Sequence, residues 1–176
     1  MAGERHGLVL VLTGDGKGKT TAALGQALRA IGHGKRVLMV QFMKGDGRYG
    51  ELRAARHLPG LEIVQSGLPT FVKRGEPGAD DVRLAREGLG VVAEALAGRR
   101  YDLVILDEVN VAIDYGLLPV DEVLALLRAR PAEVDVVLTG RAAHPRVVEF
   151  ADTVSEVRSL KHHYEAGVPA RAGIEY

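Results

Sequence analysis

A glycine- and lysine-rich octapeptide near the start of the chain contains the residue types that bind phosphate. Residues 14–21 read Gly-Asp-Gly-Lys-Gly-Lys-Thr-Thr. Glycines let backbone N–H groups turn inward around an anion, and the N-terminus of a following helix adds a partial positive charge. Lys19 can reach the outer phosphates, the Thr20 hydroxyl can bind Mg²⁺ (or Mn²⁺), and Lys17 is a further cation. The segment therefore predicts a nucleoside triphosphate site, with contacts from Gly14, Asp15, Gly16, Lys17, Gly18, Lys19, Thr20 and Thr21.

This segment, called the phosphate loop below, departs by one residue from the common pattern G-x-x-x-x-G-K-[ST]. Residues 18–20 fill the last three positions, but the first glycine position is Thr13. Gly14 and Gly16 supply the flexibility instead. An apolar run ends before the loop and helical spacing begins at Lys19, so the strand-loop-helix context is present. That context favours a phosphate site over a glycine-rich turn with chance lysines.

A pair of acids, Asp107 and Glu108, follows a strongly apolar run. Two acids alone often mark the surface end of a strand. Beside a phosphate loop, however, this is the expected place of a carboxylate that binds magnesium. We therefore predict a metal site formed by Thr20, Glu108 and Asp107, and the spacing leaves open which acid contacts the ion. In many ATPases the second acid orients a water for hydrolysis, so the pair does not decide the reaction.

The composition is that of an ordinary globular chain. It has 176 residues, 47% hydrophobic and 26% charged, which fits one domain with a sizeable core. Lys+Arg and Asp+Glu both total 23, which argues against a basic nucleic-acid surface. The absence of cysteine excludes disulfides, zinc-thiolate sites, iron–sulfur clusters and a thiol nucleophile.

The start of the chain indicates a cytoplasmic protein. Residues 1–6 include an acid, and the apolar run that follows is too short for a signal peptide. No segment approaches the roughly 20 apolar residues of a membrane span. We therefore expect neither secretion nor a membrane partner.

Apolar runs alternate with helical patterns, which is typical of a parallel sheet covered on both faces. The long segments 43–60 and 66–79, rich in Gly, Pro and charge, follow strands on the side where such sheets bind ligands. We predict a single α/β domain over residues 1–176, with three α/β/α layers like those of phosphate-loop NTPases and a mostly parallel sheet. The expected strands are 7–13, 36–42, 61–65, 101–107, 134–139 and 153–157, and the expected helices are 19–31, 80–96, 120–129 and 144–151.

Several segments together resemble the phosphate-loop class of ATP:corrinoid adenosyltransferase, also called cob(I)alamin or cob(I)yrinic acid a,c-diamide adenosyltransferase. The resemblance covers nearly the whole chain. The phosphate loop is shared with many ATPases, but its combination with Gln-Phe-x-Lys-Gly and with the ending Gly-Ile-Glu-Tyr is much more specific. The segments are residues 13–21, 40–45, 106–116, 138–141 with His144, 151–156, and the C-terminal tail, residues 160–176.

The resemblance implies that a corrinoid, reduced to Co(I), attacks the 5′ carbon of ATP and that triphosphate leaves, in adenosylcobalamin biosynthesis or salvage. Co(I) is a very strong nucleophile, so no side-chain base is needed. The protein must align the reactants and stabilise charge on the triphosphate, and we assign that catalytic role to Lys19 and Lys17. By matching position, Thr20 and Glu108 hold the metal, with Asp107 beside them. The resemblance also implies that the nucleotide binds the loop in the reverse orientation to that in ordinary ATPases, which exposes the 5′ carbon and not the γ-phosphate.

The resemblance further implies nucleotide contacts from Gln41, Arg171 and Gly173, with Glu51 nearby. Some relatives use a Phe-Thr-Trp segment to displace the lower cobalt ligand. This chain has no Trp, and Phe71 is the only aromatic candidate for a corrinoid contact. A lone Phe in a loop is equally a packing anchor. A homodimer and an electron donor, either a flavin-dependent reductase or flavodoxin, also follow from the resemblance.

Two other readings stay open at this point. One is a phosphate-loop ATPase that couples hydrolysis to a switch or to partner binding. The other is a small-molecule kinase, for which Arg48, Arg53 and Arg56 would supply a lid. Arg141 follows a strand and is either a salt-bridged surface residue, which we favour, or a phosphate sensor. The tail has the alternative reading of a solvated terminus.

Overall fold

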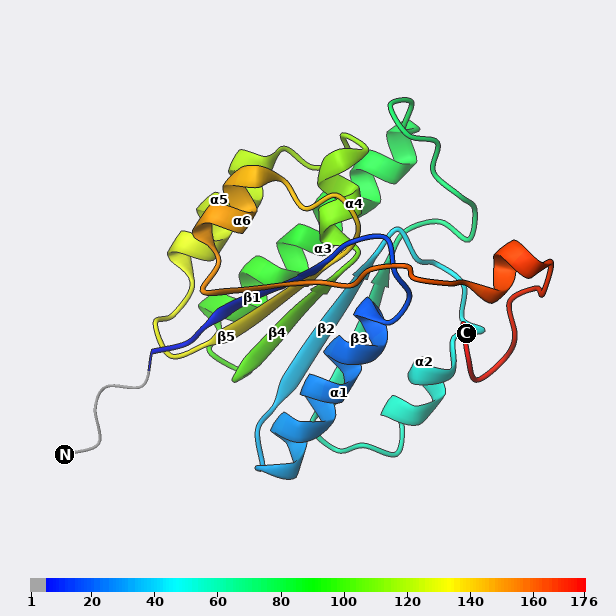
Figure 1. Ribbon diagram of the computed structural model, residues 1–176. Helices are drawn as coiled ribbons and strands as arrows, with labels where there is room; N and C mark the ends of the chain where they lie inside the picture. The colour runs from blue at the N-terminus through cyan, green and yellow to red at the C-terminus, as the bar shows by residue number, and fades with distance from the viewer. Residues whose placement is uncertain (1–5) are drawn as a thin grey trace.

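The computed structural model describes residues 6–176 and forms one six-stranded sheet with helices on both faces (Figure 1). Part of the signal-peptide argument rests on residues 1–5, which lie outside the described residues. The strand order is β3-β2-β4-β5-β1-β6, and every pairing is parallel. The strands are β1 (Val9–Thr13), β2 (Val37–Phe42), β3 (Leu61–Ser66), β4 (Leu103–Asp107), β5 (Asp135–Thr139) and β6 (Thr153–Glu156).

The central strands β2 and β4 are apolar except for Gln41 and Asp107 near their ends, because the sheet buries both of their faces. Every residue of both strands is buried. A parallel sheet covered by helices on each side requires such continuous apolar runs. All strands end at the same edge of the sheet, so the phosphate loop after β1 and the acid pair at the end of β4 are brought together.

The helices form two layers. The first contains α1 (Lys19–Gly32) and the short α2 (Gly50–Ala55), which lie on one side of the sheet (Figure 1). Ala23, Ala27 and Ala30 of α1 are buried against strand residues such as Met39 and Ile105. The small alanine side chains allow α1 to pack closely on the sheet. The opposite layer contains α3 (Ala79–Ala97), α4 (Val109–Asp114), α5 (Val120–Ala129) and α6 (Pro145–Phe150).

Most predicted elements are confirmed to within one or two residues, and α5 has the predicted bounds. Two short α-helices and the 3₁₀-helix at His163–Ala166 were missed. The segment 43–60, expected to be a loop, contains α2, and α4 follows directly after β4. Helices of six residues carry too little periodicity to be recognised. In α4, Val109 and Val111 are also β-branched, and they resemble a continuation of the strand.

The chain after β6 runs across the phosphate loop. The N–H of Gly16 donates to the carbonyl of Val157 at 2.7 Å. The tail then contains one turn of 3₁₀-helix, η1 (His163–Ala166), and ends beside α2 (Figure 1). Across residues 6–176 no helix is both long and apolar enough to span a membrane.

A glycine pair in α3 gives a test of how closely this helix packs. A Cβ at Gly88 would lie 2.4 Å from Ser66 Oγ and 3.1 Å from Phe42 Cε1, whereas a Cβ at Gly90 would meet nothing within 4 Å. We expect Gly88→Ala to lower the free energy of unfolding by about 1–3 kcal/mol because of overpacking. Gly90→Ala, the matched control, should raise it by about 0.5–1 kcal/mol through helix propensity. Urea denaturation measures both, and equal effects would contradict the packing of α3 on β2 and β3.

Candidate active site

The phosphate loop is held by the buried amine of Lys19. Its Nζ donates to the carbonyls of Gly14 and Gly16, both at 2.7 Å, and the residue is only 7% exposed. Burial lowers the pKa of Lys19, although nearby carboxylates oppose the shift. Gly14 has φ of 93°, and a Cβ there would lie 2.5 Å from the Val157 carbonyl oxygen. Gly14 stands one position after the first glycine of the common pattern. A glycine is required here because the chain at Val157 crosses the loop at this point.

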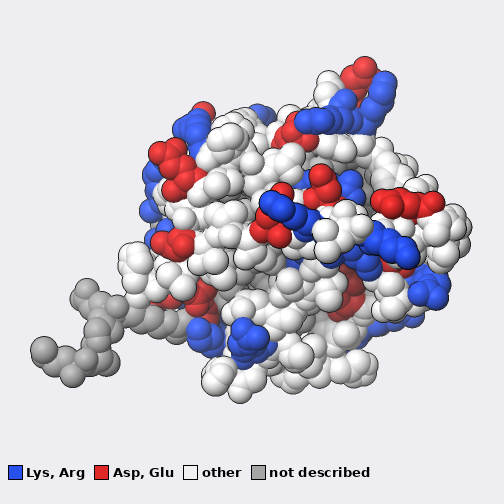
Figure 2. Space-filling model, in the orientation of Figure 1, with Lys and Arg blue, Asp and Glu red and all other residues white. Residues whose placement is uncertain are grey.

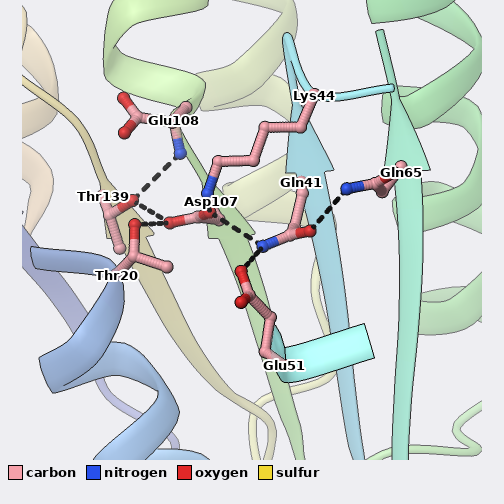
Figure 3. Close-up of polar contacts among 8 residues, drawn as sticks. All are labelled: Thr20, Gln41, Lys44, Glu51, Gln65, Asp107, Glu108 and Thr139. Atoms are coloured by element: carbon pink, nitrogen blue, oxygen red, sulfur yellow. Dashed lines mark hydrogen bonds and ion pairs between the residues drawn. The ribbon is translucent and has the colours of Figure 1, made fainter. Parts of the chain in front are cut away.

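Asp107, at the end of β4, is fully buried and accepts four hydrogen bonds (Figure 3). Its Oδ1 accepts from Thr20 Oγ1 at 2.8 Å and from Thr139 Oγ1 at 2.7 Å. Its Oδ2 accepts from Lys44 Nζ at 2.8 Å and from Gln41 Nε2 at 3.4 Å. With two donors on each oxygen, this carboxylate ties the phosphate loop to strands β2 and β5.

Glu108 differs from its neighbour because its carboxylate accepts no hydrogen bond among the described residues and lines the main cavity. Its backbone has φ of 64°, and its N–H donates to Thr139 Oγ1 at 2.9 Å. Burial, and then the charge of Asp107, raise the pKa of Glu108. The left-handed backbone turns the chain from β4 into α4 and directs this carboxylate away from Asp107 (Figure 3).

These contacts fit a divalent cation. The Thr20 hydroxyl donates its proton to Asp107, so its oxygen lone pairs remain able to bind a cation, and Glu108 has an unpaired carboxylate. Within residues 6–176, no three His, Asp or Glu side chains form a metal site by themselves. Mg²⁺ bound here would take its remaining ligands from substrate phosphates and water, as is usual for this ion.

Lys44, just after β2, belongs to this cluster of side chains, although spacing did not predict it. Burial opposes its charge, but the carboxylates of Asp107, Glu108 and Glu51 together outweigh burial and raise the pKa of Lys44. Its amine also lies 5.0 Å from the centre of the Tyr49 ring. The only sequence signal was its place in the Gln-Phe-x-Lys-Gly segment. In the same network, Gln41 donates to Glu51 at 2.9 Å and accepts from Gln65 at 3.2 Å.

A cavity of about 720 Å³ opens above the phosphate loop. This volume is within the usual range for small-molecule sites, about 300–1,000 Å³. One part is polar and contains the loop, Lys44 and Glu108, and the other lies along α1 and α2 and is lined by Leu24, Leu28, Ala54, Leu58 and Leu61. A ligand with a charged end and a flat apolar end would match both parts.

The structure brings most of the predicted nucleotide contacts to this cavity. Residues 15–21 and Gly173 line it, whereas Gly14 is not part of the lining and accepts from Lys19 through its carbonyl. Gln41 is fully buried and lies below the cavity, beside Asp107. The exposed Arg171 is not part of its lining. Arg141 is exposed, as predicted, but it lines the cavity and makes no ion pair among the described residues, so the predicted salt bridge was wrong.

Most residues of the tail are exposed, as in a solvated terminus, but part of the tail also lines the cavity. His162, Gly173, Ile174 and Glu175 form part of the cavity wall. Lys17 Nζ donates to the Ile174 carbonyl at 2.7 Å. This contact joins residues 157 positions apart in the chain.

Phe71 is fully exposed and packs on nothing, so its interpretation as a packing anchor was wrong. It lines a second cavity, of about 140 Å³, formed by the segments that follow β2 and β3. Lys44 and Tyr49 line both cavities. An exposed aromatic ring therefore lies at the border of the main site.

The charges of this face are mixed. Figure 2 shows Lys and Arg side chains interspersed with Asp and Glu, with no extended area of one sign. This face lacks the basic stripe typical of nucleic-acid binding.

Known proteins are similar in sequence to nearly the whole of this chain. A corrinoid adenosyltransferase of Escherichia coli (strain K12) is 41% identical over 176 residues, which cover 99% of this chain and 88% of that protein. The corrinoid adenosyltransferase CobA of Salmonella typhimurium is 41% identical, with the same coverage. The flagellar accessory protein FlaH from Methanocaldococcus jannaschii superimposes with a TM-score of 0.58 at 15% identity, covering 86% of this chain and 71% of its own, which supports the fold alone.

A family model described as ATP:corrinoid adenosyltransferase BtuR/CobO/CobP matches residues 5–176. The match includes the phosphate loop, the acid pair and the tail, which the fold places around one cavity. The chain therefore belongs to the ATP:corrinoid adenosyltransferase family.

Proposed function

We propose that this protein transfers the 5′-deoxyadenosyl group of ATP to the Co(I) centre of a reduced corrinoid, in cobalamin metabolism. Membership of the family over residues 5–176 is the observation that carries the proposal. The electron pair of Co(I) forms the cobalt–carbon bond. The bond between the 5′ carbon and its oxygen breaks, and its electrons leave with triphosphate, so cobalt becomes formally Co(III).

The residues of the cavity match the demands of this reaction. Negative charge develops on the leaving triphosphate, and cations fixed in advance stabilise it most effectively. Lys19 is fixed by two carbonyls, Lys17 lies at the cavity wall, and Lys44 is fixed by Asp107. We assign the first two to the triphosphate, and Lys44 to the same charged part of the site.

We assign Thr20 and Glu108 as direct ligands of Mg²⁺ or Mn²⁺. When bound, the ion neutralises charge on the triphosphate. Asp107 has both oxygens occupied by protein donors, so we assign it the role of orienting Thr20 and Lys44. This division of roles follows from the hydrogen bonds, which the sequence could not reveal.

The corrinoid side is assigned to the segments after β2 and β3. Phe71 is exposed there and lines the cavity of about 140 Å³ next to the main site. Arg74 of the same segment pairs with Asp114 at 2.8 Å, which ties it to the end of α4. We propose that Phe71 contacts the corrinoid, because it is the fully exposed aromatic side chain at this border, whereas the partly buried Tyr49 lies against Lys44.

The remaining assignments rest on the family likeness. We propose that residues 1–176 form one adenosyltransferase domain, that the protein is a cytoplasmic homodimer, and that a flavin-dependent reductase or flavodoxin supplies the electron. Gel filtration with light scattering tests the dimer. Reconstitution with either class of donor tests the electron source.

A direct assay separates this function from a phosphate-loop ATPase switch. With ATP, Mg²⁺ and a chemically reduced corrinoid, we expect the absorbance change of an alkylated corrinoid and one triphosphate per adenosyl group. Phosphate release without corrinoid, and no cobalt–carbon bond, would instead indicate the ATPase.

The contacts of the lid arginines do not favour a small-molecule kinase. Arg48 pairs with Asp46 at 2.6 Å and Arg53 donates to the Arg48 carbonyl, so both side chains contact their own segment.

A further inference from the structure

The tail returns to the phosphate loop and binds its more exposed lysine. Lys17 Nζ donates to the Ile174 carbonyl at 2.7 Å and lies 3.2 Å from Glu175 Oε1. Lys19, by contrast, is buried and held by the carbonyls of its own loop. The side chain of Lys17 is 36% exposed. Of these two loop cations, Lys17 is therefore the one whose position depends on the tail.

The Glu175 carboxylate is held in place by the tail itself. Its Oε2 accepts from the Arg171 N–H at 2.7 Å, and its Oε1 lies 3.2 Å from His163 Nε2. The Arg171 N–H, and after it Lys17 and His163, keep the pKa of the Glu175 carboxyl below its usual value. The side chain is 19% exposed, and the residue lines the main cavity. An ionised carboxylate is thus fixed beside a lysine assigned to the triphosphate.

An enzyme that stabilises a leaving group must also release it. Triphosphate carries several negative charges, and a loop that binds them tightly in the transition state also holds the product. A fixed carboxylate beside one of its cations opposes this binding in two ways. It competes for the ammonium donors, and it repels the anion.

We propose that Glu175 is a positioning residue that draws Lys17 away from bound triphosphate and so speeds product release. This inference rests on the proposed function, which makes triphosphate the product. It assigns the tail a role in turnover rather than in nucleotide recognition. The two lysines then have different roles. Lys19 stays in place in the phosphate loop, whereas Lys17 exchanges between the triphosphate and the tail.

The test is the substitution Glu175→Gln, with Glu165→Gln as matched control. Glu165 is an exposed carboxylate of the same tail that makes no ion pair among residues 6–176 and does not line the cavity. We expect Glu175→Gln to tighten triphosphate binding, measured by calorimetry with Mg²⁺, by about five-fold, as for loss of one partly exposed charge contact. Multiple-turnover kcat should fall while the single-turnover rate is retained. Glu165→Gln should change none of these.

The substitution Glu175→Gln could also act by loosening the tail. A double-mutant cycle with Lys17→Met separates that effect from the proposed one. In a Lys17→Met background, Glu175→Gln should leave the affinity for triphosphate nearly unchanged, because the exchanged cation is gone. Weaker triphosphate binding by Glu175→Gln, an equal shift in Glu165→Gln, or an undiminished effect without Lys17 would each overturn the inference. Triphosphate binding needs no corrinoid. A protein that failed to adenosylate but showed the predicted cycle would therefore refute the proposed function, with product release by Glu175, and retain only the effect of Glu175 on triphosphate affinity through Lys17.

Discussion

Replacing Lys19 with alanine should reduce the single-turnover rate of adenosyl transfer by about 10²–10³-fold, the usual cost of removing one fixed donor from a charge-stabilising site. Lys19 is 7% exposed and lies at the wall of the cavity, with its amine 2.7 Å from two loop carbonyls. The substitution removes a cation from the triphosphate and also a support of the loop. Both losses slow the departure of triphosphate from the 5′ carbon, because the loop stabilises the developing charge only in its phosphate-binding conformation. Stopped-flow absorbance of the corrinoid, after mixing with ATP, measures the rate.

Lys35→Ala is the matched control for this experiment. Lys35 pairs with Asp135 at 3.4 Å, at the edge of the sheet where β5 begins, away from the phosphate loop. It should retain the wild-type rate. Thermal melts of both variants separate a catalytic loss from unfolding. Full activity in folded Lys19→Ala would refute the assigned role of the phosphate loop.

Much of the fold follows from patterns within short segments. The runs that became β2 and β4 are apolar at nearly every position, which indicates burial on both faces, and the loop after β1 carries its own motif. Since parallel strands end at one edge, the sequence also predicted that the loop and the acid pair lie together. Thr20 and Asp107 are indeed joined at 2.8 Å.

The details of the site depended on contacts between distant segments. Lys44 is bound to Asp107, 63 residues away, and Lys17 to Ile174, 157 residues away. No local periodicity encodes such pairs. The positive φ at Glu108 likewise separates the two acids, although their spacing makes them equivalent. For these reasons the sequence predicted which residues form the site but not what each one contacts.

Glu108→Gln and Asp107→Asn should differ in their effects on stability. We expect Glu108→Gln to reduce adenosyl transfer by about 10²-fold through loss of a metal ligand, without lowering the free energy of unfolding. Its carboxylate accepts no hydrogen bond among the described residues, and burial raises the pKa of Glu108. The folded protein therefore disfavours its charge, and a neutral side chain of the same shape removes that cost. Mn²⁺ binding, followed by electron paramagnetic resonance in the presence of ATP, should weaken.

Asp107→Asn should instead lower the free energy of unfolding by about 3–5 kcal/mol, as when one partner of a buried ion pair is removed. Lys44 then loses the carboxylate at 2.8 Å, and an amide nitrogen must face a hydrogen-bond donor in a fully buried position. Urea denaturation of the two variants decides the assignment. If Asp107→Asn were as stable as wild type and lost Mn²⁺, while Glu108→Gln unfolded easily, the roles of the two acids would be reversed. The hydrogen bonds argue against that reversal, because a carboxylate that already accepts four donors has little capacity left for an ion.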